Sequence, residues 1–267
     1  MPAAPPPRPT RRWSLLLRDG FRLLDGERAV AVPSRERRVL AALALQGRRP
    51  RAHLSGLLWP DSEERRAQAS LRAAIWRIQH LAQGLLTEAD GLLGLAPGTH
   101  VDVHELRALT HRVVDREPLE SPATALDVLR RGPLLPGWYD DWVLEQRAHL
   151  HQQQLRCLET LAQEFIGTGQ LDAALEAAMT AATLEPLRES AHRTLIQVHL
   201  QEGNHMEAVT VYRDFSERLR RELGIAASAK MVELVRPLVQ GPPAPPLRVR
   251  RAGSARRAER DGSRQAR

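Results

Sequence analysis

The apolar residues of this chain follow two different patterns, and the change between them lies near residues 101–103. Before that point, short apolar segments at 13–17, 21–25 and 29–32 are separated by Asp-Gly pairs. Short apolar runs that alternate with Asp-Gly turns are typical of antiparallel strands. We therefore expect a small antiparallel sheet at the start of the ordered chain.

Three helices are predicted after this sheet. The first runs from Ser34, a candidate N-cap, to Gly47, which ends the helical apolar spacing. A second, short helix follows Pro50, and a tight break leads into a long third helix, where Asp61 and Glu64 have the spacing of a capping box. A helix, a short turn and a longer helix form the helix-turn-helix pattern.

Two short apolar segments on either side of Asp90-Gly91 predict a β-hairpin directly after the third helix. A hairpin at this place would be the wing of a winged helix-turn-helix. Beyond it the pattern is helical almost throughout. We therefore expect a mainly α protein, with a winged helix-turn-helix domain (α+β) over residues 13–104 and an all-α, tetratricopeptide-like domain over residues 105–240.

The predicted third helix has two distinct sides. Leu71, Ile75, Ile78 and Ala82 recur at steps of four, three and four residues, so they form a narrow stripe that packs inward. The opposite side carries small, aromatic and basic residues. It consists of Arg66, Ala69, Ala73, Trp76, Arg77 and His80, with Arg65, Ser70 and Arg72 on its flanks.

The chemistry of this outward side suits a DNA duplex. The major groove, about 12 Å wide, admits one helix, and small residues let the helix backbone approach the bases while arginine pairs with guanine or contacts phosphate. We expect alanine at Arg72 or Arg77 to weaken specific DNA binding and to leave the fold intact. The alternative is a solvated face on which the arginines accompany Glu63 and Glu64.

The second half of the chain contains an internal repeat. A shift of 34 residues superposes Leu161 on Leu195, Gly169 on Gly203 and Ala174 on Ala208. This is the tetratricopeptide period, in which each unit is a pair of helices. Since two repeats are few, we expect flanking helices near residues 122–131, 141–155 and 228–238 to cap them.

Two stretches of sequence resemble a known family in the family's own order. The segments RERRVLAALAL and LLWPDSEERRAQASLRAAIWRIQ, within residues 35–79, resemble the winged-helix output domain of OmpR-like regulators, in the variant of the SARP-type antibiotic regulatory proteins. Residues 133–225, which include LLPGWYDDWVLEQR, resemble the bacterial transcriptional activator domain that follows this winged helix. Together the two stretches cover most of the ordered chain.

The resemblance implies a sequence-specific transcriptional regulator that activates genes from repeated sites in double-stranded promoter DNA and contacts RNA polymerase. It leaves open whether the subunits self-associate on those sites. It implies that Arg51 approaches a phosphate and that the major groove receives the face formed by Ser70, Arg72, Ala73, Trp76 and Arg77. The wing tip departs from the family, since residues 88–91 are acidic where an arginine is common.

The net charge of +7 is unevenly distributed. Residues 1–12, 13–104 and 241–267 are each net basic, whereas residues 105–240 are net acidic. A basic first domain suits a polyanionic partner, because neutralisation of phosphates drives nucleic-acid affinity. Residues 1–12 and the basic tail lack apolar periodicity, so we expect both to be disordered and the tail to add salt-dependent phosphate contacts.

Composition argues against several other classes of protein. The single cysteine, Cys157, allows no disulfide within the chain and no Cys-rich zinc site. No apolar run is long enough to span a membrane, and the first residues lack the hydrophobic core of a signal peptide, so we expect a cytoplasmic protein. The only lysine, Lys230, does not lie in a P-loop, and we expect neither an enzyme nor a bound cofactor.

Other candidate sites have a structural interpretation that we prefer. His100 and His104 could hold a metal, but no carboxylate or thiol motif completes the ligand set. Asp140 and Asp141 could act as general acid and base, but N-capping of a helix explains them. Cys157 lies on a helical apolar stripe and is expected in the core. Three aromatic residues are expected to seal the junction between the domains instead of forming a ligand cage: Trp138, Tyr139 and Trp142.

A second class of function uses the same elements. In that alternative the chain is a tetratricopeptide-type scaffold for a protein partner, and the winged helix is a packing or dimerising module without specific DNA binding. The two classes differ in salt dependence, because binding to duplex DNA weakens steeply as salt rises.

Overall fold

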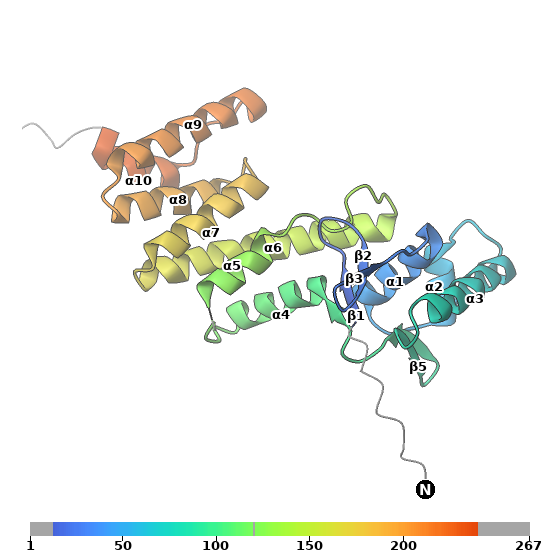
Figure 1. The fold of residues 1–267 in the computed structure, drawn as a ribbon. Coiled ribbons are helices and arrows are strands. Elements are labelled where there is room, and N and C mark those ends of the chain that lie inside the picture. The colour runs from blue at the N-terminus through green and yellow to red at the C-terminus, as the bar shows by residue number, and fades with distance from the viewer. Residues whose placement is uncertain (1–12, 120, 240–267) are drawn as a thin grey trace, which may run out of the picture.

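The computed structural model describes residues 13–119 and 121–239. The two segments that we expect to be disordered, 1–12 and 241–267, lie outside the described residues. Figure 1 shows the mixed α and β elements at one end of an elongated molecule and a stack of helices at the other. The predicted fold class, a winged helix followed by an all-helical domain, is confirmed.

A small sheet begins the fold. Its strands, in the order β3-β2-β1-β7, are β1 (Trp13–Leu16), β2 (Arg22–Asp25), β3 (Arg28–Val30) and β7 (His100–Val101). The first three strands pair antiparallel, as predicted, and their turns place Asp19 and Gly26 at positive φ. The fourth strand, β7, pairs parallel to β1. Because parallel neighbours need a long crossover connection, β7 comes from a part of the chain far from the other three strands.

Three helices follow, namely α1 (Ser34–Gln46), α2 (Arg51–Leu58) and α3 (Glu64–Leu81). Gly47 ends α1 at a φ of 75°, as expected. Two of the predicted caps are wrong. Pro33, not Ser34, is the N-cap of α1, and Glu63 is the N-cap of α3 with no side-chain capping bond. The cause at α3 is a separate turn, in which the Ser62 N–H donates to the Trp59 carbonyl at 3.2 Å, so the helix starts later.

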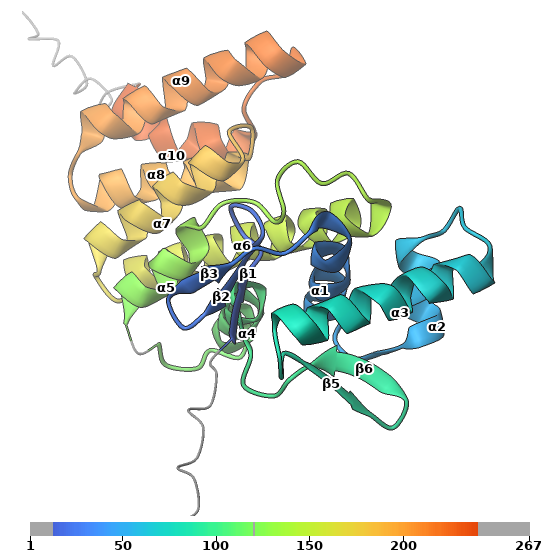
Figure 2. The ribbon, with the colours of Figure 1, turned by 45° about the vertical axis from the view of Figure 1, so that its right-hand side comes forward.

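The predicted wing is present as a β-hairpin. It consists of β5 (Leu86–Ala89) and β6 (Leu92–Leu95), and the short β4 (Arg49–Pro50) pairs with β6 to complete a sheet in the order β4-β6-β5. Both turn residues, Asp90 and Gly91, have positive φ, which is the geometry of a type I′ hairpin turn. Figure 2 shows this hairpin next to α3.

The rest of the described chain, up to residue 239, is mainly helical. Its helices are α4 (Asp102–Val114), α5 (Pro122–Arg130), α6 (Asp141–Gly167), α7 (Leu171–Leu184), α8 (Glu189–Gln201), α9 (His205–Leu223) and α10 (Ala229–Val239). Gly169 and Gly203, which the 34-residue shift superposes, end equivalent helices with φ of 74° and 78°. One expectation differs, because the predicted flanking helix 141–155 is the first part of the single long helix α6.

Two clusters of buried apolar residues form the core. The larger is a single cluster of contacting side chains, with members from Trp13 in β1 to Val198 in α8. The winged helix and the first helices of the repeat domain therefore share one core. The smaller lies among α8, α9 and α10 and consists of Ile196, Ala208, Phe215, Leu219, Met231 and Val235. In the part of the chain that the structure describes, no helix is long and apolar enough to cross a membrane.

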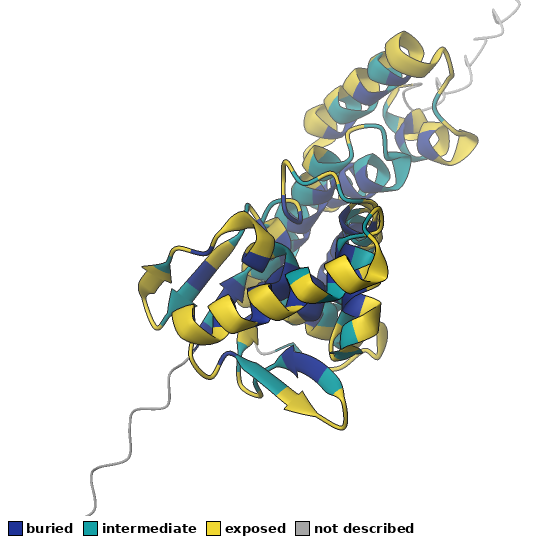
Figure 3. Ribbon diagram, turned by 90° about the vertical axis from the view of Figure 1, so that its right-hand side faces the viewer, coloured by how far each residue is buried: buried dark blue, intermediate teal, exposed yellow. Residues whose placement is uncertain are grey.

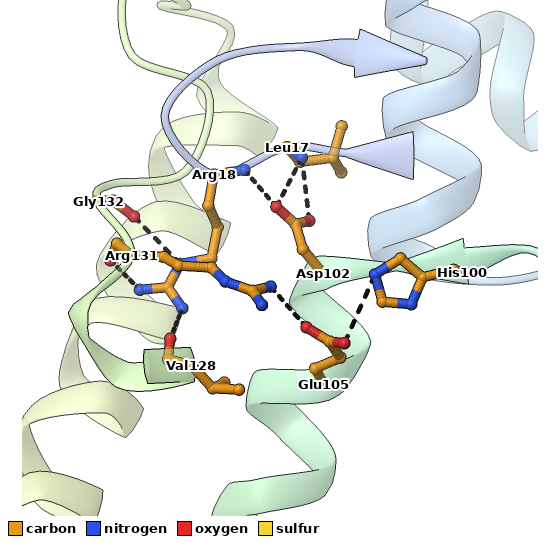
Figure 4. Close-up of polar contacts among 8 residues, drawn as sticks. All are labelled: Leu17, Arg18, His100, Asp102, Glu105, Val128, Arg131 and Gly132. Carbon is orange, nitrogen blue, oxygen red and sulfur yellow. Dashed lines mark hydrogen bonds and ion pairs between the residues drawn. The ribbon is translucent and has the colours of Figure 1, made fainter. Parts of the chain in front are cut away.

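Buried polar contacts also join the two halves (Figure 4). The Asp102 carboxylate, at the start of α4, accepts hydrogen bonds from the main-chain N–H groups of Leu17 and Arg18 at 2.9–3.0 Å. The Arg18 guanidinium, only 3% exposed, donates to the main-chain carbonyls of Val128, Arg131 and Gly132. Burial lowers the pKa of Arg18 to about 10. The end of β1 is thereby fixed to both α4 and the chain after α5.

Candidate nucleic-acid interface

Helix α3 has one buried and one exposed side, as the apolar spacing predicts. Leu71, Ile75 and Ile78 are buried, and Ala82, which caps the helix, is buried as well. These side chains belong to the larger core cluster, which anchors the helix to the domain. The opposite side of α3 lies at the surface of the molecule. Figure 3 shows exposed residues, in yellow, along this part of the fold. The helix is therefore held by one side only.

The exposed side of α3 carries most of the predicted DNA-contacting residues. The exposed members are Arg65, Arg66, Arg72, Ala73, Trp76 and Arg77, and Ser70 is partly exposed. The side chains of Arg65, Arg66 and Arg72 make no ion pair or hydrogen bond within residues 13–119 and 121–239. Glu64 instead accepts a hydrogen bond from Gln68 at 2.9 Å. The positive charges of these three arginines are therefore not paired with a nearby carboxylate.

Trp76 projects from this side with 60% of its surface exposed. Its ring lies 4.0 Å from the His80 ring, centroid to centroid, and the His80 Nδ1 lies 2.8 Å from the Trp76 carbonyl oxygen. The indole of Trp76 and the imidazole of His80, one helical turn apart, therefore lie in contact. The exposed part of the indole is available for contact from the solvent side.

Arg77 differs from the other arginines because it reaches back to the domain. Its Nη1 lies 3.5 Å from Oε1 of Glu36, whose side chain is fully buried in α1. The second carboxylate oxygen of Glu36 has no hydrogen-bond partner in the described part of the chain. Sequence analysis missed this role of Glu36. A usable signal exists, since Glu36 precedes the apolar residues Val39 and Leu40 by three and four positions and so lies on their inward face.

Arg51 lies apart from α3 and contacts the wing. At the start of α2 its Nε and Nη2 donate to both oxygens of Glu88 in β5, at 3.0 and 2.7 Å. This hydrogen-bonded pair raises the pKa of Arg51 and lowers the pKa of Glu88. The contact connects α2 to the hairpin and offsets the charge of one acidic residue near the wing tip.

The other candidate sites take part in packing. His104 Nε2 lies 2.7 Å from the Ala44 carbonyl oxygen, and His100 lies 3.5 Å from Glu105. No group of three metal-ligating side chains occurs within the residues described. Cys157 is buried, as predicted, and burial raises its pKa to about 12.

The residues at the start of α6 differ in part from expectation. Asp140 precedes the helix but makes no capping bond, because its carboxylate pairs with Arg38 of α1 at 2.5 Å. Trp142 is buried, and Trp138 stacks on Phe21 of the winged part with 6.4 Å between ring centroids. Tyr139 is 79% exposed, so the prediction that it seals the junction is wrong.

Comparisons with known proteins agree with this architecture. The family model of the bacterial transcriptional activator domain matches residues 101–238, just over half of the chain. The chain is similar to the regulatory protein AfsR of Streptomyces coelicolor, with 29% identity over 248 residues that cover 88% of this chain and 24% of AfsR. The chain thus spans about a quarter of the length of that relative.

A solved structure has a similar fold. It is EmbR of Mycobacterium tuberculosis in complex with a low-affinity phosphopeptide, and the match has a TM-score of 0.65, 21% sequence identity, and coverage of 87% of this chain and 66% of EmbR. The family match begins at residue 101, immediately before α4, whereas the domain boundary at residues 104–105 stays a prediction. The chain belongs to the bacterial transcriptional activator domain family.

Proposed function

We propose that this protein activates transcription by binding promoter DNA in a sequence-specific manner, with α3 in the major groove. The observation that carries the proposal is the exposed side of α3, on which Arg65, Arg66 and Arg72 have no partner within the described residues. Arginines of this kind are free to contact phosphates or guanine. The buried stripe on the opposite side holds the helix in place while this face meets the duplex.

The small residues and the aromatic residue on this face have complementary roles. Ala69 and Ala73 are exposed and keep the middle of the face slim, which allows the helix to enter the groove. Ser70 donates to a base edge or a phosphate, and the indole of Trp76 contacts apolar groups such as thymine methyls. Arg77 contributes from the end of the helix.

Arg51 contributes at the edge of this interface. Because it already pairs with Glu88, its approach to a phosphate requires the guanidinium to share or exchange that carboxylate. We propose that the hairpin lies against the DNA backbone next to α3. The helical repeat domain then contacts RNA polymerase or a second copy of the chain bound at a neighbouring site.

A gel-shift titration with operator DNA recovered by selection of bound fragments tests this function. We expect Arg72→Ala to weaken specific binding by about 1–3 kcal/mol, because it removes a groove contact. The matched control is Arg213→Ala, an equal change at an exposed arginine of α9, which should leave the affinity unchanged.

Salt dependence separates a regulator from the alternative scaffold. The affinity of the wild-type chain should fall steeply between about 50 mM and about 200 mM salt, because DNA binding displaces counterions. Absence of duplex binding at the lower salt concentration, or an Arg72→Ala variant that binds as tightly as wild type, would reject the proposed interface.

A further inference from the structure

A cavity of about 280 Å³ lies where the winged part meets the helical domain. Its walls come from the loop after β1, from α4, from residues 132–134 and from α6. Most of the lining is aliphatic, with Leu106, Leu134 and Leu150 among the contributors. Ligand pockets in proteins are typically apolar with a few convergent polar groups, and this cavity lies near the lower end of their size range, about 300 Å³.

Two arginines line this cavity, and neither guanidinium forms an ion pair within the described residues, although the nearby Asp102 and Asp19 carboxylates offset part of the lowering that burial imposes on the pKa of Arg18. Arg18 is 3% exposed and Arg147 is partly buried. The cavity lining itself contains no carboxylate. Buried cations are normally paired, because removal from water disfavours the charged form. The lowered pKa of Arg18 has this cause.

Hydrogen-bonding capacity at the cavity is also unused. Arg147 donates through Nε and Nη2 to the carbonyls of Leu134, Leu135 and Trp138, but its Nη1 has no partner within the residues that the structure describes. Gln154 is only 5% exposed, and its Nε2 donates to the main-chain carbonyls of Leu129 and Arg131, so its amide nitrogen is already satisfied. A carboxylate is an acceptor that would take the hydrogen bond left open at Arg147 Nη1.

We propose that this cavity binds a small monocarboxylate with a compact apolar body. The carboxylate would accept from Nη1 of Arg147 and offset the charge of the two guanidinium groups. The apolar body would pack against the leucines. This inference does not depend on the DNA interface, because α3 contributes nothing to the cavity lining.

A substitution at the rim of the cavity can block its opening. Ala148 lines the cavity from α6 and is exposed, so a larger side chain there fills the opening without entering the core. Its neighbour His149 is exposed but does not line the cavity. Ala148→Phe and His149→Phe therefore form a matched pair, and neither removes a contact of Arg18 or Arg147.

Isothermal titration calorimetry of the full chain tests the proposal with benzoate, phenylacetate and hexanoate as probes, and with the corresponding neutral amides as controls. We expect at least one carboxylate to bind with a Kd between about 10 µM and about 1 mM, at least about tenfold more tightly than its amide. Ala148→Phe should weaken this binding at least about tenfold, and His149→Phe should preserve it.

Three results would overturn the proposal: no carboxylate binding up to about 10 mM, equal binding of acid and amide, or unchanged binding by Ala148→Phe. Because the readout is binding of a small molecule to the protein alone, a failure here is distinguishable from a failure to bind DNA.

Discussion

The contact between Glu36 and Arg77 changes what we expect of one predicted DNA-contacting residue. Arg77→Ala leaves the fully buried Glu36 carboxylate without its cation, so the free energy of unfolding should fall by about 1–3 kcal/mol. Arg72 is exposed and has no partner within the described residues, so Arg72→Ala should change stability by less than about 0.5 kcal/mol. Denaturant unfolding followed by circular dichroism measures both values.

A double variant separates the buried charge from other losses at position 77. In Glu36→Gln/Arg77→Ala the buried group is neutral, and a buried neutral amide costs less than an unpaired carboxylate. The double variant should therefore be more stable than Arg77→Ala alone. Equal stability of the two variants would contradict the role assigned to Glu36.

Burial of Cys157 leads to a second prediction at the scale of single residues. With its pKa raised to about 12, almost none of this thiol is the reactive thiolate near neutral pH. The native protein should resist a disulfide-exchange reagent such as DTNB at about pH 8, and the thiol should react at once in denaturant. Rapid reaction of the native protein would show that the core around α6 opens readily.

At the scale of elements, two glycines allow opposite predictions. Gly91 has a φ of 73° in the wing turn, so Gly91→Ala strains the backbone and should destabilise the protein by about 1 kcal/mol. Gly56 is exposed inside α2, and an added Cβ there meets no atom within 4 Å. Gly56→Ala should stabilise the protein by up to about 1 kcal/mol, through helix propensity. Thermal unfolding distinguishes the two, and changes of the same sign would refute the argument.

The elements were predictable to the extent that their signals are local. The inward stripe of α3, the wing turn at Asp90-Gly91 and the 34-residue repeat all depend on spacing within short stretches, and the structure contains each of them. The 34-residue period gave a wrong helix boundary only at α6, where a helix is expected to end near residue 155. No Gly or Pro interrupts residues 141–166, and the helix continues past that point.

The ion pairs between distant parts of the chain were not predictable in the same way. Arg77 and Glu36 are 41 residues apart in the sequence, Arg51 and Glu88 are 37 apart, and Arg38 and Asp140 are 102 apart. Each pair exists because the tertiary fold brings two helices, or a helix and the wing, together. Spacing along one element carries no information about such a partner.

At the scale of the whole molecule, the division of the core predicts how the protein opens. Helices α1 and α6 bury residues in the same cluster, whereas α10 packs only in the smaller cluster with α8 and α9. Regions that share a core tend to open together, and a small peripheral cluster opens at lower free energy. Native-state hydrogen exchange should therefore give similar opening free energies for the most protected amides of α1 and α6, and lower values for α10. If α1 opened well below α6 while α10 matched α6, the winged part would be an independent unit, and the cavity at its junction with the helical domain would have no rigid frame.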